Sequence, residues 1–243
     1  MVIRVIQFCP SVDATAFGGA TIVVIDVLRA TTTIASALAN GAREIVPVSS
    51  VEDALRIADG EADRPLLAGE SQNAPIPGFD LGNSPSLFTP DRVHGKRVVF
   101  RTTNGTQVLR AFSKSANVLS ASFSNLDAVT RWLVKEAAAE VVLVCAGQDA
   151  QFSLEDFLCA GAIIDRLEAK MPVTLDDAAI AARGLFRASE GRLEATMRSG
   201  NHAQSLIDSG MGDDIAFATR IDRYDVVPRL TNGTIVDAAV LDP

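Results

Sequence analysis

The sequence predicts a three-layer α/β/α fold built on a largely parallel or mixed sheet, with a helical insertion in its second half. Short β-branched runs alternate with helical patterns, which is the rhythm of βαβ units. Runs such as VVLVC (141–145) are apolar on both faces, as strands covered by helices are. The 243 residues are 48% hydrophobic, enough for a large core. We expect one domain over 1–243, with two packed α/β lobes that meet near 125–150 as the alternative.

The elements of the sheet follow from short runs rich in Val, Ile and Leu, each bounded by polar residues or glycine. Strands are predicted at 2–8, 21–27, 44–48, 64–68, 96–100, 117–122 and 140–146. Helices with apolar residues at helical spacing are predicted at 32–39, 51–58, 105–112 and 125–138. The stretch 69–92 carries four prolines with several Gly and Asn, so it is predicted to be an irregular loop of the length that often serves function.

The second half is predicted to be mainly helical. The pattern runs from Leu154 to about Arg187 with a break near Met171–Pro172, and a polar helical stretch follows at 189–209. Strands are predicted at 224–228 and 234–240, separated by an Asn-Gly turn that tolerates positive φ. These two strands are expected to return to the main sheet.

Composition excludes several classes of function. A formal net charge of -8 and a pI near 4.8 argue against a partner such as nucleic acid, which needs clustered Lys and Arg. Three cysteines without paired spacing indicate neither a disulfide framework nor a zinc site. The most apolar N-terminal stretch, 21–38, is interrupted by Asp26 and Arg29, which argues against a membrane span. We expect a soluble, cytoplasmic protein with no membrane partner.

The segment VVIDVLRATTT (23–33) runs from a buried strand directly into a helix. It places polar residues at the carboxyl end of a strand, the edge where open α/β sheets bind ligands: Asp26, Arg29, Thr31, Thr32 and Thr33. Backbone N–H groups, hydroxyls and a guanidinium suit a phosphate. A threonine helix cap with an ion pair between Asp26 and Arg29 is the simpler alternative.

A second segment, FRTTNGT (100–106), repeats this arrangement after another strand. Its donor-rich turn is formed by Arg101, Thr102, Thr103, Asn104, Gly105 and Thr106. Glycine at this position lets the backbone approach an anion closely. Because two such turns follow two predicted strands, the sequence predicts an anion-binding site.

Five carboxylates are candidate ligands for Mg²⁺, which prefers hard oxygen atoms: Asp26, Glu70, Asp80, Glu155 and Asp156. Glu70 and Asp80 share the 69–92 loop with Asn83 and Ser84, so a metal-binding or closing role competes with a plain surface loop. Asp156 stands three residues after Ser153, which is the spacing of a helix capping box. Capping is therefore the default interpretation for that pair.

Common phosphatase motifs are missing. Cys145 has no Arg six residues later, and Asp26 lacks the second aspartate of a D-x-D motif because position 28 is leucine. No phosphate-binding G-x4-G-K-[ST] loop occurs. The two histidines, His94 and His202, stand in no catalytic pattern and are predicted to be surface residues.

Five blocks together are similar to the motifs of a known family. IDVLRATTTIASALANGA, LAGE, GFDLGNSP, TTNGT and VCAGQDAQFSLEDFLCAG occur in an order that resembles the 2-phosphosulfolactate phosphatase family, and the similarity weakens beyond about residue 162. The resemblance implies a Mg²⁺-dependent α/β phosphatase that hydrolyses 2-phosphosulfolactate to sulfolactate and phosphate in coenzyme M biosynthesis. Whether the chain forms a homodimer is left open.

The resulting hypothesis assigns roles to residues. Arg29, the threonines 31–33 and the turn 101–106 hold the phosphate and acid groups, while Asp26 and Glu70 help hold Mg²⁺. Direct attack by water and an aspartyl-phosphate on Asp26 remain alternatives. Two other functions also remain: a phosphatase for another small 2-phospho-organic acid, and a non-catalytic sensor of such an anion.

Overall fold

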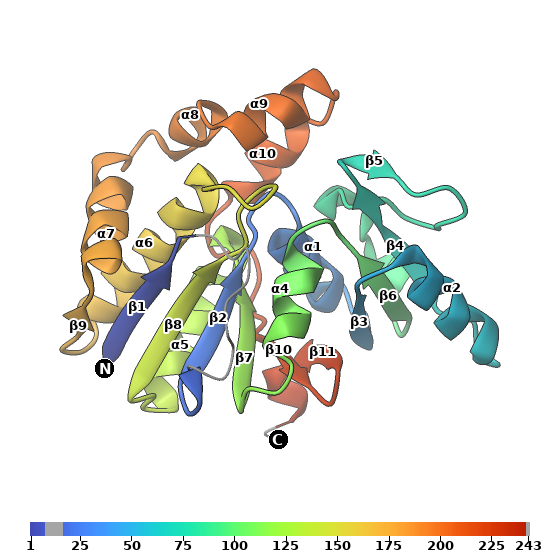
Figure 1. The fold of residues 1–243 in the computed structure, drawn as a ribbon, viewed down its shortest axis with the longest axis horizontal. Helices are drawn as coiled ribbons and strands as arrows, with labels where there is room; N and C mark the ends of the chain where they lie inside the picture. The colour runs from blue at the N-terminus through green and yellow to red at the C-terminus, as the bar shows by residue number, and fades with distance from the viewer. Residues whose placement is uncertain (8–16, 242–243) are drawn as a thin grey trace.

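The computed structural model describes residues 1–7 and 17–241. Its centre is an eleven-stranded mixed sheet in the order β5-β4-β6-β3-β11-β10-β7-β2-β8-β1-β9 (Figure 1). The strands are β1 Val2–Ile6, β2 Thr21–Ile25, β3 Glu44–Val48, β4 Leu66–Ser71, β5 Ala74–Pro75, β6 Arg97–Arg101, β7 Asn117–Ala121, β8 Glu140–Cys145, β9 Thr174–Leu175, β10 Pro228–Thr231 and β11 Thr234–Asp237.

Helices surround this sheet. In the part of the chain that the structure describes, they are α1 Ala30–Ala39, α2 Val51–Gly60, α3 Pro90–Val93, α4 Gly105–Ala111, α5 Leu126–Lys135, α6 Leu154–Glu168, α7 Asp177–Ala188, α8 Leu193–Arg198, α9 Asn201–Asp208 and α10 Asp213–Ala218. Across the described ranges, no helix has the length and apolar character that a membrane crossing requires.

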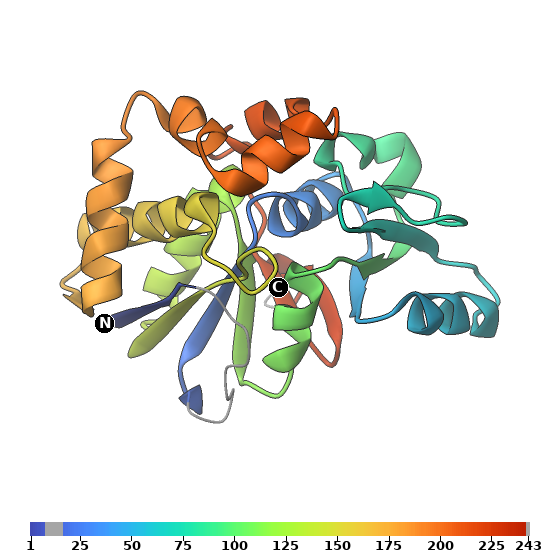
Figure 2. The same cartoon turned by 45° about the horizontal axis from the view of Figure 1, so that its top comes forward.

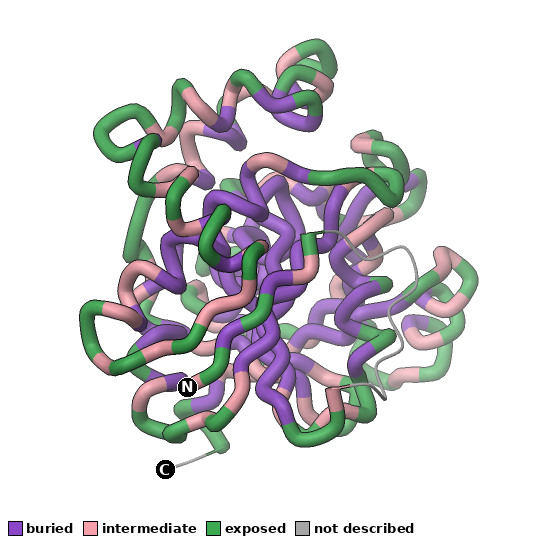
Figure 3. The backbone as a smooth tube through the Cα atoms, turned by 60° about the vertical axis from the view of Figure 1, so that its left-hand side comes forward, coloured by how far each residue is buried: buried purple, intermediate pink, exposed green. Residues whose placement is uncertain are grey.

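The layers follow from the alternation of side chains along each strand. All five residues of β2 are buried. Val23 and Ile25 face a core formed with α5, α6 and α7, while Ile22 and Val24 face a second core formed with α1 and α4. Figure 3 shows the buried residues gathered in the middle of the molecule, with exposed residues around its outside. The predicted α/β/α fold is confirmed.

The sheet consists of two parallel groups joined by a hairpin. Strands β7, β2, β8, β1 and β9 run parallel, and so do β3, β6 and β4. The hairpin β10–β11 lies between the groups and pairs antiparallel with β7 and β3. Its turn uses Asn232 at φ 49° and Gly233 at φ 80°, as the Asn-Gly dipeptide predicts. The predicted return of the last strands to the main sheet is therefore confirmed.

Helices α8, α9 and α10 form a cap over the sheet edge at which β2 and β8 end (Figures 1 and 2). The cap contributes its apolar side chains Met197, Ala203, Leu206 and Ile215 to the same core as α6 and α7. The polar helical stretch predicted at 189–209 is in fact two helices, and α10 was not predicted.

Two other predictions need correction. The segment 224–227 is not a strand, because the N–H of Tyr224 donates to the carbonyl of Ser124 and pairing begins only at Pro228. The 69–92 stretch is less irregular than predicted, because β4 extends into it and forms a hairpin with β5. That hairpin turns through Gln72 and Asn73, both with positive φ. Phe8, the last residue of the strand predicted at 2–8, lies outside the described residues.

Candidate functional site

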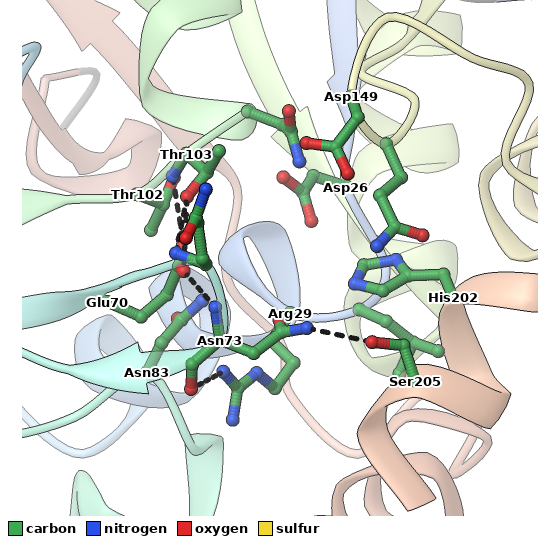
Figure 4. A pocket seen from close by; sticks show the side chains of 14 residues that line it. Asp26, Arg29, Glu70, Asn73, Asn83, Thr102, Thr103, Asp149, His202 and Ser205 are labelled. Atoms are coloured by element: carbon green, nitrogen blue, oxygen red, sulfur yellow. Dashed lines mark hydrogen bonds between the residues drawn. The ribbon is translucent and has the colours of Figure 1, made fainter. Parts of the chain in front are cut away.

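A pocket of about 190 Å³ opens where the carboxyl ends of β2, β4, β6 and β8 approach the cap helix α9 (Figure 4). Ligand sites of open α/β sheets occupy this kind of edge. Seven residues predicted from the sequence line it: Asp26, Arg29, Glu70, Asn83, Thr102, Thr103 and Asn104. The two predicted donor-rich turns therefore meet in one place.

Asp26 follows β2 directly and is only 6% exposed. Its Oδ1 accepts a hydrogen bond of 3.1 Å from the N–H of Ala30, and the described residues provide no hydrogen bond to Oδ2. Burial raises the pKa of Asp26 to about 6; the charge of His202 lowers it, and those of Glu70 and Glu155 raise it further. Keeping this carboxylate charged costs free energy, and a bound cation would lower that cost.

The three threonines after Arg29 do not line the pocket. The hydroxyl of Thr31 donates to the carbonyl of Asp26 and accepts from the N–H of the same residue, at 2.8 Å and 3.1 Å. Thr32 donates to the Val27 carbonyl and Thr33 to the Asn83 carbonyl, both at 2.8 Å. These hydroxyls fix the strand-to-helix turn that presents Asp26.

Glu70 links the β4–β5 hairpin to the turn after β6. Its Oε1 accepts from the N–H of Thr103 at 2.6 Å, and its Oε2 accepts from the N–H of Asn73 at 2.7 Å and from the Thr103 hydroxyl at 3.1 Å. Arg101 does not line the pocket and donates to the carbonyl of Glu70 at 2.6 Å. The turn is further closed by hydrogen bonds between Thr102 and Thr106.

Arg29 is 3% exposed and pairs with a cap residue, not with Asp26. Its Nη1 lies 2.9 Å from Oδ2 of Asp214 in α10. The other oxygen of Asp214 accepts from the hydroxyl of Ser84. Ser84 thus supports Arg29 indirectly and does not line the pocket.

His202 was predicted to be a surface residue, and that prediction is wrong. It is buried in α9, lines the pocket, and its Nδ1 lies 2.8 Å from Oε1 of Glu155. Burial lowers the pKa of His202, but the hydrogen bond and the charge of Glu155 outweigh it, so the pKa lies above its ordinary value. Glu155 therefore favours the charged form of this imidazole, whose charge in turn acts on Asp26.

The other candidate metal ligands lie behind or away from the pocket. Asp156 is buried and accepts from the N–H groups of Val27 and Gly147, so it ties the ends of β2 and β8 together. Burial raises its pKa well above the usual range, and so do neighbouring carboxylates. The predicted capping box fails, because Ser153 makes no capping hydrogen bond. Asp80 forms an ion pair with Arg64 at 3.0 Å, outside the pocket lining.

Among the described residues, no three His, Cys, Asp or Glu side chains converge into a preformed metal centre. Carboxylates still gather at the site, because Asp149 also lines the pocket and points toward Asp26 (Figure 4).

Sequence reasoning missed seven lining residues: Leu28, Gln72, Asn73, Gln148, Asp149, His202 and Ser205. Gln148 and Asp149 stand three and four residues after the end of β8, so the strand-end rule that identified Asp26 also points to this segment. His202 and Ser205 share one face of α9, but no pattern in the sequence connects that helix with the sheet edge.

Gly105 does not line the pocket, yet it shapes it. A Cβ at this position would lie 2.5 Å from Oδ2 of Asp26 and 2.7 Å from Cβ of Ala30. We expect Gly105→Ala to displace the Asp26 carboxylate and lower kcat by about 10² without changing any charge, since a shift of about 1 Å costs that much. Steady-state kinetics check this, with Gly184→Ala as the control, because a Cβ on this exposed glycine of α7 would meet no atom within 4 Å. Equal kcat values for both variants would contradict it.

Comparison with known proteins gives a consistent result. The family model described as 2-phosphosulpholactate phosphatase matches residues 10–233. A protein named "Probable 2-phosphosulfolactate phosphatase" from Symbiobacterium thermophilum is 43% identical over 225 residues, which cover 92% of this chain and 96% of that protein. A protein of the same name from Thermotoga maritima is 43% identical over 216 residues, covering 89% and 91%. Another from Caldanaerobacter subterraneus is 40% identical over 215 residues, covering 88% and 89%.

Proposed function

Because the chain belongs to the 2-phosphosulfolactate phosphatase family, we propose that it hydrolyses 2-phosphosulfolactate to sulfolactate and inorganic phosphate in the pocket beside Asp26. The main support is that the region matched by the family model, residues 10–233, contains every residue that lines the pocket. A role of this reaction in coenzyme M biosynthesis stays a prediction.

The size and polarity of the pocket support a small acid as substrate. A volume of about 190 Å³ lies below the roughly 300–1,000 Å³ of pockets for drug-sized ligands. Amides, hydroxyls and charged groups provide most of the lining, as in Asn73, Asn104, Gln148 and Ser205. A three-carbon acid with a phosphate and a sulfonate suits such a pocket better than a nucleotide does.

The charge of the pocket favours a divalent cation. Three carboxylates line it, those of Asp26, Glu70 and Asp149, whereas Arg29 is the only Lys or Arg in the lining that the structure describes. A substrate with three acid groups would meet net repulsion there.

The donor set fits Mg²⁺, which takes one or two carboxylates together with waters and substrate oxygens. Oδ2 of Asp26 makes no hydrogen bond to the described residues. Oδ1 of Asn83 is buried and has no hydrogen-bond partner in the described chain. We assign Asp26 and Asn83 as the first candidates to hold Mg²⁺. When bound, the ion would neutralise phosphate charge and polarise the phosphoryl group.

The chain's own residues bind the substrate and manage its protons. Arg29 holds phosphate oxygens, and the Asn104 and Gln148 amides hydrogen bond to the remaining acid groups. Hydrolysis breaks the bond between phosphorus and the C2 oxygen and adds the oxygen of water to phosphorus. His202, whose pKa is raised beside Glu155, donates a proton to the leaving oxygen. Asp26 either orients the water or forms an aspartyl-phosphate, which rapid acid quenching of a turnover mixture would trap.

The proposal is tested by measuring phosphate release from a panel of 2-phospho-organic acids, including phosphosulfolactate and phospholactate, with Mg²⁺ and then with EDTA. We expect release that is fastest with phosphosulfolactate and that EDTA removes. Faster release from phospholactate would indicate a different acid as substrate. Thermal stabilisation by a phospho-acid without any release would indicate a sensor and overturn the proposal.

A further inference from the structure

The cap helix α10 places a carboxylate directly against the guanidinium of Arg29. The side chains of Arg29 and Asp214 are 3% and 6% exposed, and Nη1 of Arg29 lies 2.9 Å from Oδ2 of Asp214. Arg29 also contacts Sδ of Met211 at 2.8 Å through the same nitrogen. The Nη1 end of the guanidinium is therefore fully occupied by the cap.

The opposite edge of the guanidinium is less engaged. Nη2 donates to the carbonyl of Asn73 at 3.4 Å, a long hydrogen bond. Within the described ranges, Nε of Arg29 makes no hydrogen bond to the protein, although the residue lines the pocket. A guanidinium fixed at Nη1 presents its Nε–H and Nη2–H pair as a planar fork, which matches two oxygens of a phosphate.

Asp214 is itself held on both oxygens. Ser84, just before the 3₁₀ turn at 85–87, donates to Oδ1, while Arg29 donates to Oδ2. A carboxylate with both oxygens engaged has little freedom to rotate, so it fixes the rotamer of the arginine.

We propose that Asp214 is a positioning residue, which orients Arg29 so that its Nε–Nη2 edge binds the phosphate of the substrate. This inference rests on the proposed function and goes beyond it, because it makes the cap part of the phosphate site. Asp214 itself does not contact the substrate; it acts through Arg29.

The test compares Asp214→Asn with Asp213→Asn, its exposed neighbour in the same helical turn. We expect Asp214→Asn to lower kcat/KM about 10- to 100-fold, with KM raised about tenfold, because the contact between Arg29 and the phosphate loses its alignment in the bound substrate and in the transition state. Asp213→Asn should match wild type. Ser84→Ala, which removes the second hydrogen bond to Asp214, should act in the same direction by a few fold, and it tests the idea if Asp214→Asn folds poorly.

A double-variant cycle separates positioning from a merely structural ion pair. In an Arg29→Ala background, Asp214→Asn should have no further effect on kcat/KM, since there is no guanidinium left to orient. Multiplicative losses, or an Asp214→Asn enzyme as active as Asp213→Asn, would overturn the inference.

Isothermal titration with inorganic phosphate makes the test independent of turnover. We expect the Kd for phosphate to rise about tenfold in Asp214→Asn and to stay unchanged in Asp213→Asn. If wild type hydrolyses no phospho-acid but binds phosphate about tenfold more tightly than Asp214→Asn does, the proposed function fails and the role of Asp214 stands. If wild type is active but all three proteins bind phosphate with equal Kd values, the proposed role of Asp214 is wrong and the proposed function stands.

Discussion

Replacing Asp26 by Asn is expected to lower kcat by at least about 10³-fold and, in the absence of metal, to make the protein more stable. The loss of activity follows from the position of this carboxylate, which is buried in the pocket and whose Oδ2 makes no hydrogen bond to the described part of the chain. The gain in stability follows from the pKa of Asp26, which is about 6 in the folded protein against an ordinary value of 3.8.

The sign of the stability effect is set by that difference in pKa. A carboxyl group whose pKa is raised by folding costs stability as pH rises from about 4 to about 6, because the folded state resists ionisation. The full difference corresponds to about 3 kcal/mol at neutral pH, at 1.36 kcal/mol per pKa unit. Thermal unfolding in EDTA should therefore show a higher Tm for Asp26→Asn at pH 7.5, and the difference should disappear near pH 4.

Mg²⁺ provides the matched control for this variant. Ion binding should raise the Tm of wild type and leave that of Asp26→Asn nearly unchanged, since the ligand is lost. An Asp26→Asn enzyme with near wild-type activity would show that neither proposed role of Asp26 is correct.

Replacing Arg29 by Ala is expected to reduce both activity and stability strongly. An arginine that stabilises the charge of a transferring phosphoryl group contributes about 10³- to 10⁵-fold, so kcat/KM should fall by about 10³. The free energy of unfolding should fall by about 3–5 kcal/mol, because Asp214 would remain buried without its partner. Kinetics and urea denaturation measure the two effects.

Two further variants separate the effects of Arg29. Arg29→Lys keeps the charge but loses the planar fork, so it should recover stability better than activity. The double variant Arg29→Ala with Asp214→Asn should regain part of the stability and none of the activity. Full activity in Arg29→Ala would remove this residue from the phosphate site.

The sequence was informative where local pattern decides structure. The strands β2, β3, β6, β7 and β8 lie within a few residues of the predicted ranges, because their β-branched runs are apolar on both faces. The rule that ligands bind at strand ends predicted that the turns holding Asp26 and Thr102–Asn104 form one site, and all four residues line the pocket.

Contacts between residues far apart in the chain could not be predicted from these local patterns. Arg29 was expected to bind phosphate or pair with Asp26, but its partner is Asp214, 185 residues away in the chain. His202 carries no local motif, and its burial depends on how α9 docks against Glu155. Short helices such as α8 and α10 have little periodicity, so the cap could not be placed on the sheet from sequence alone.

The hairpin β10–β11 has a consequence for how the molecule is made. These two strands follow every other strand in chain order, yet they fill the middle of the sheet between β7 and β3. Until they emerge from the ribosome, β7 and β3 each present an unpaired edge to neighbouring nascent chains. The sheet can therefore be completed only after its last two strands are made, and a chain that ends before residue 228 would leave the edges of β7 and β3 without these partners, which favours association.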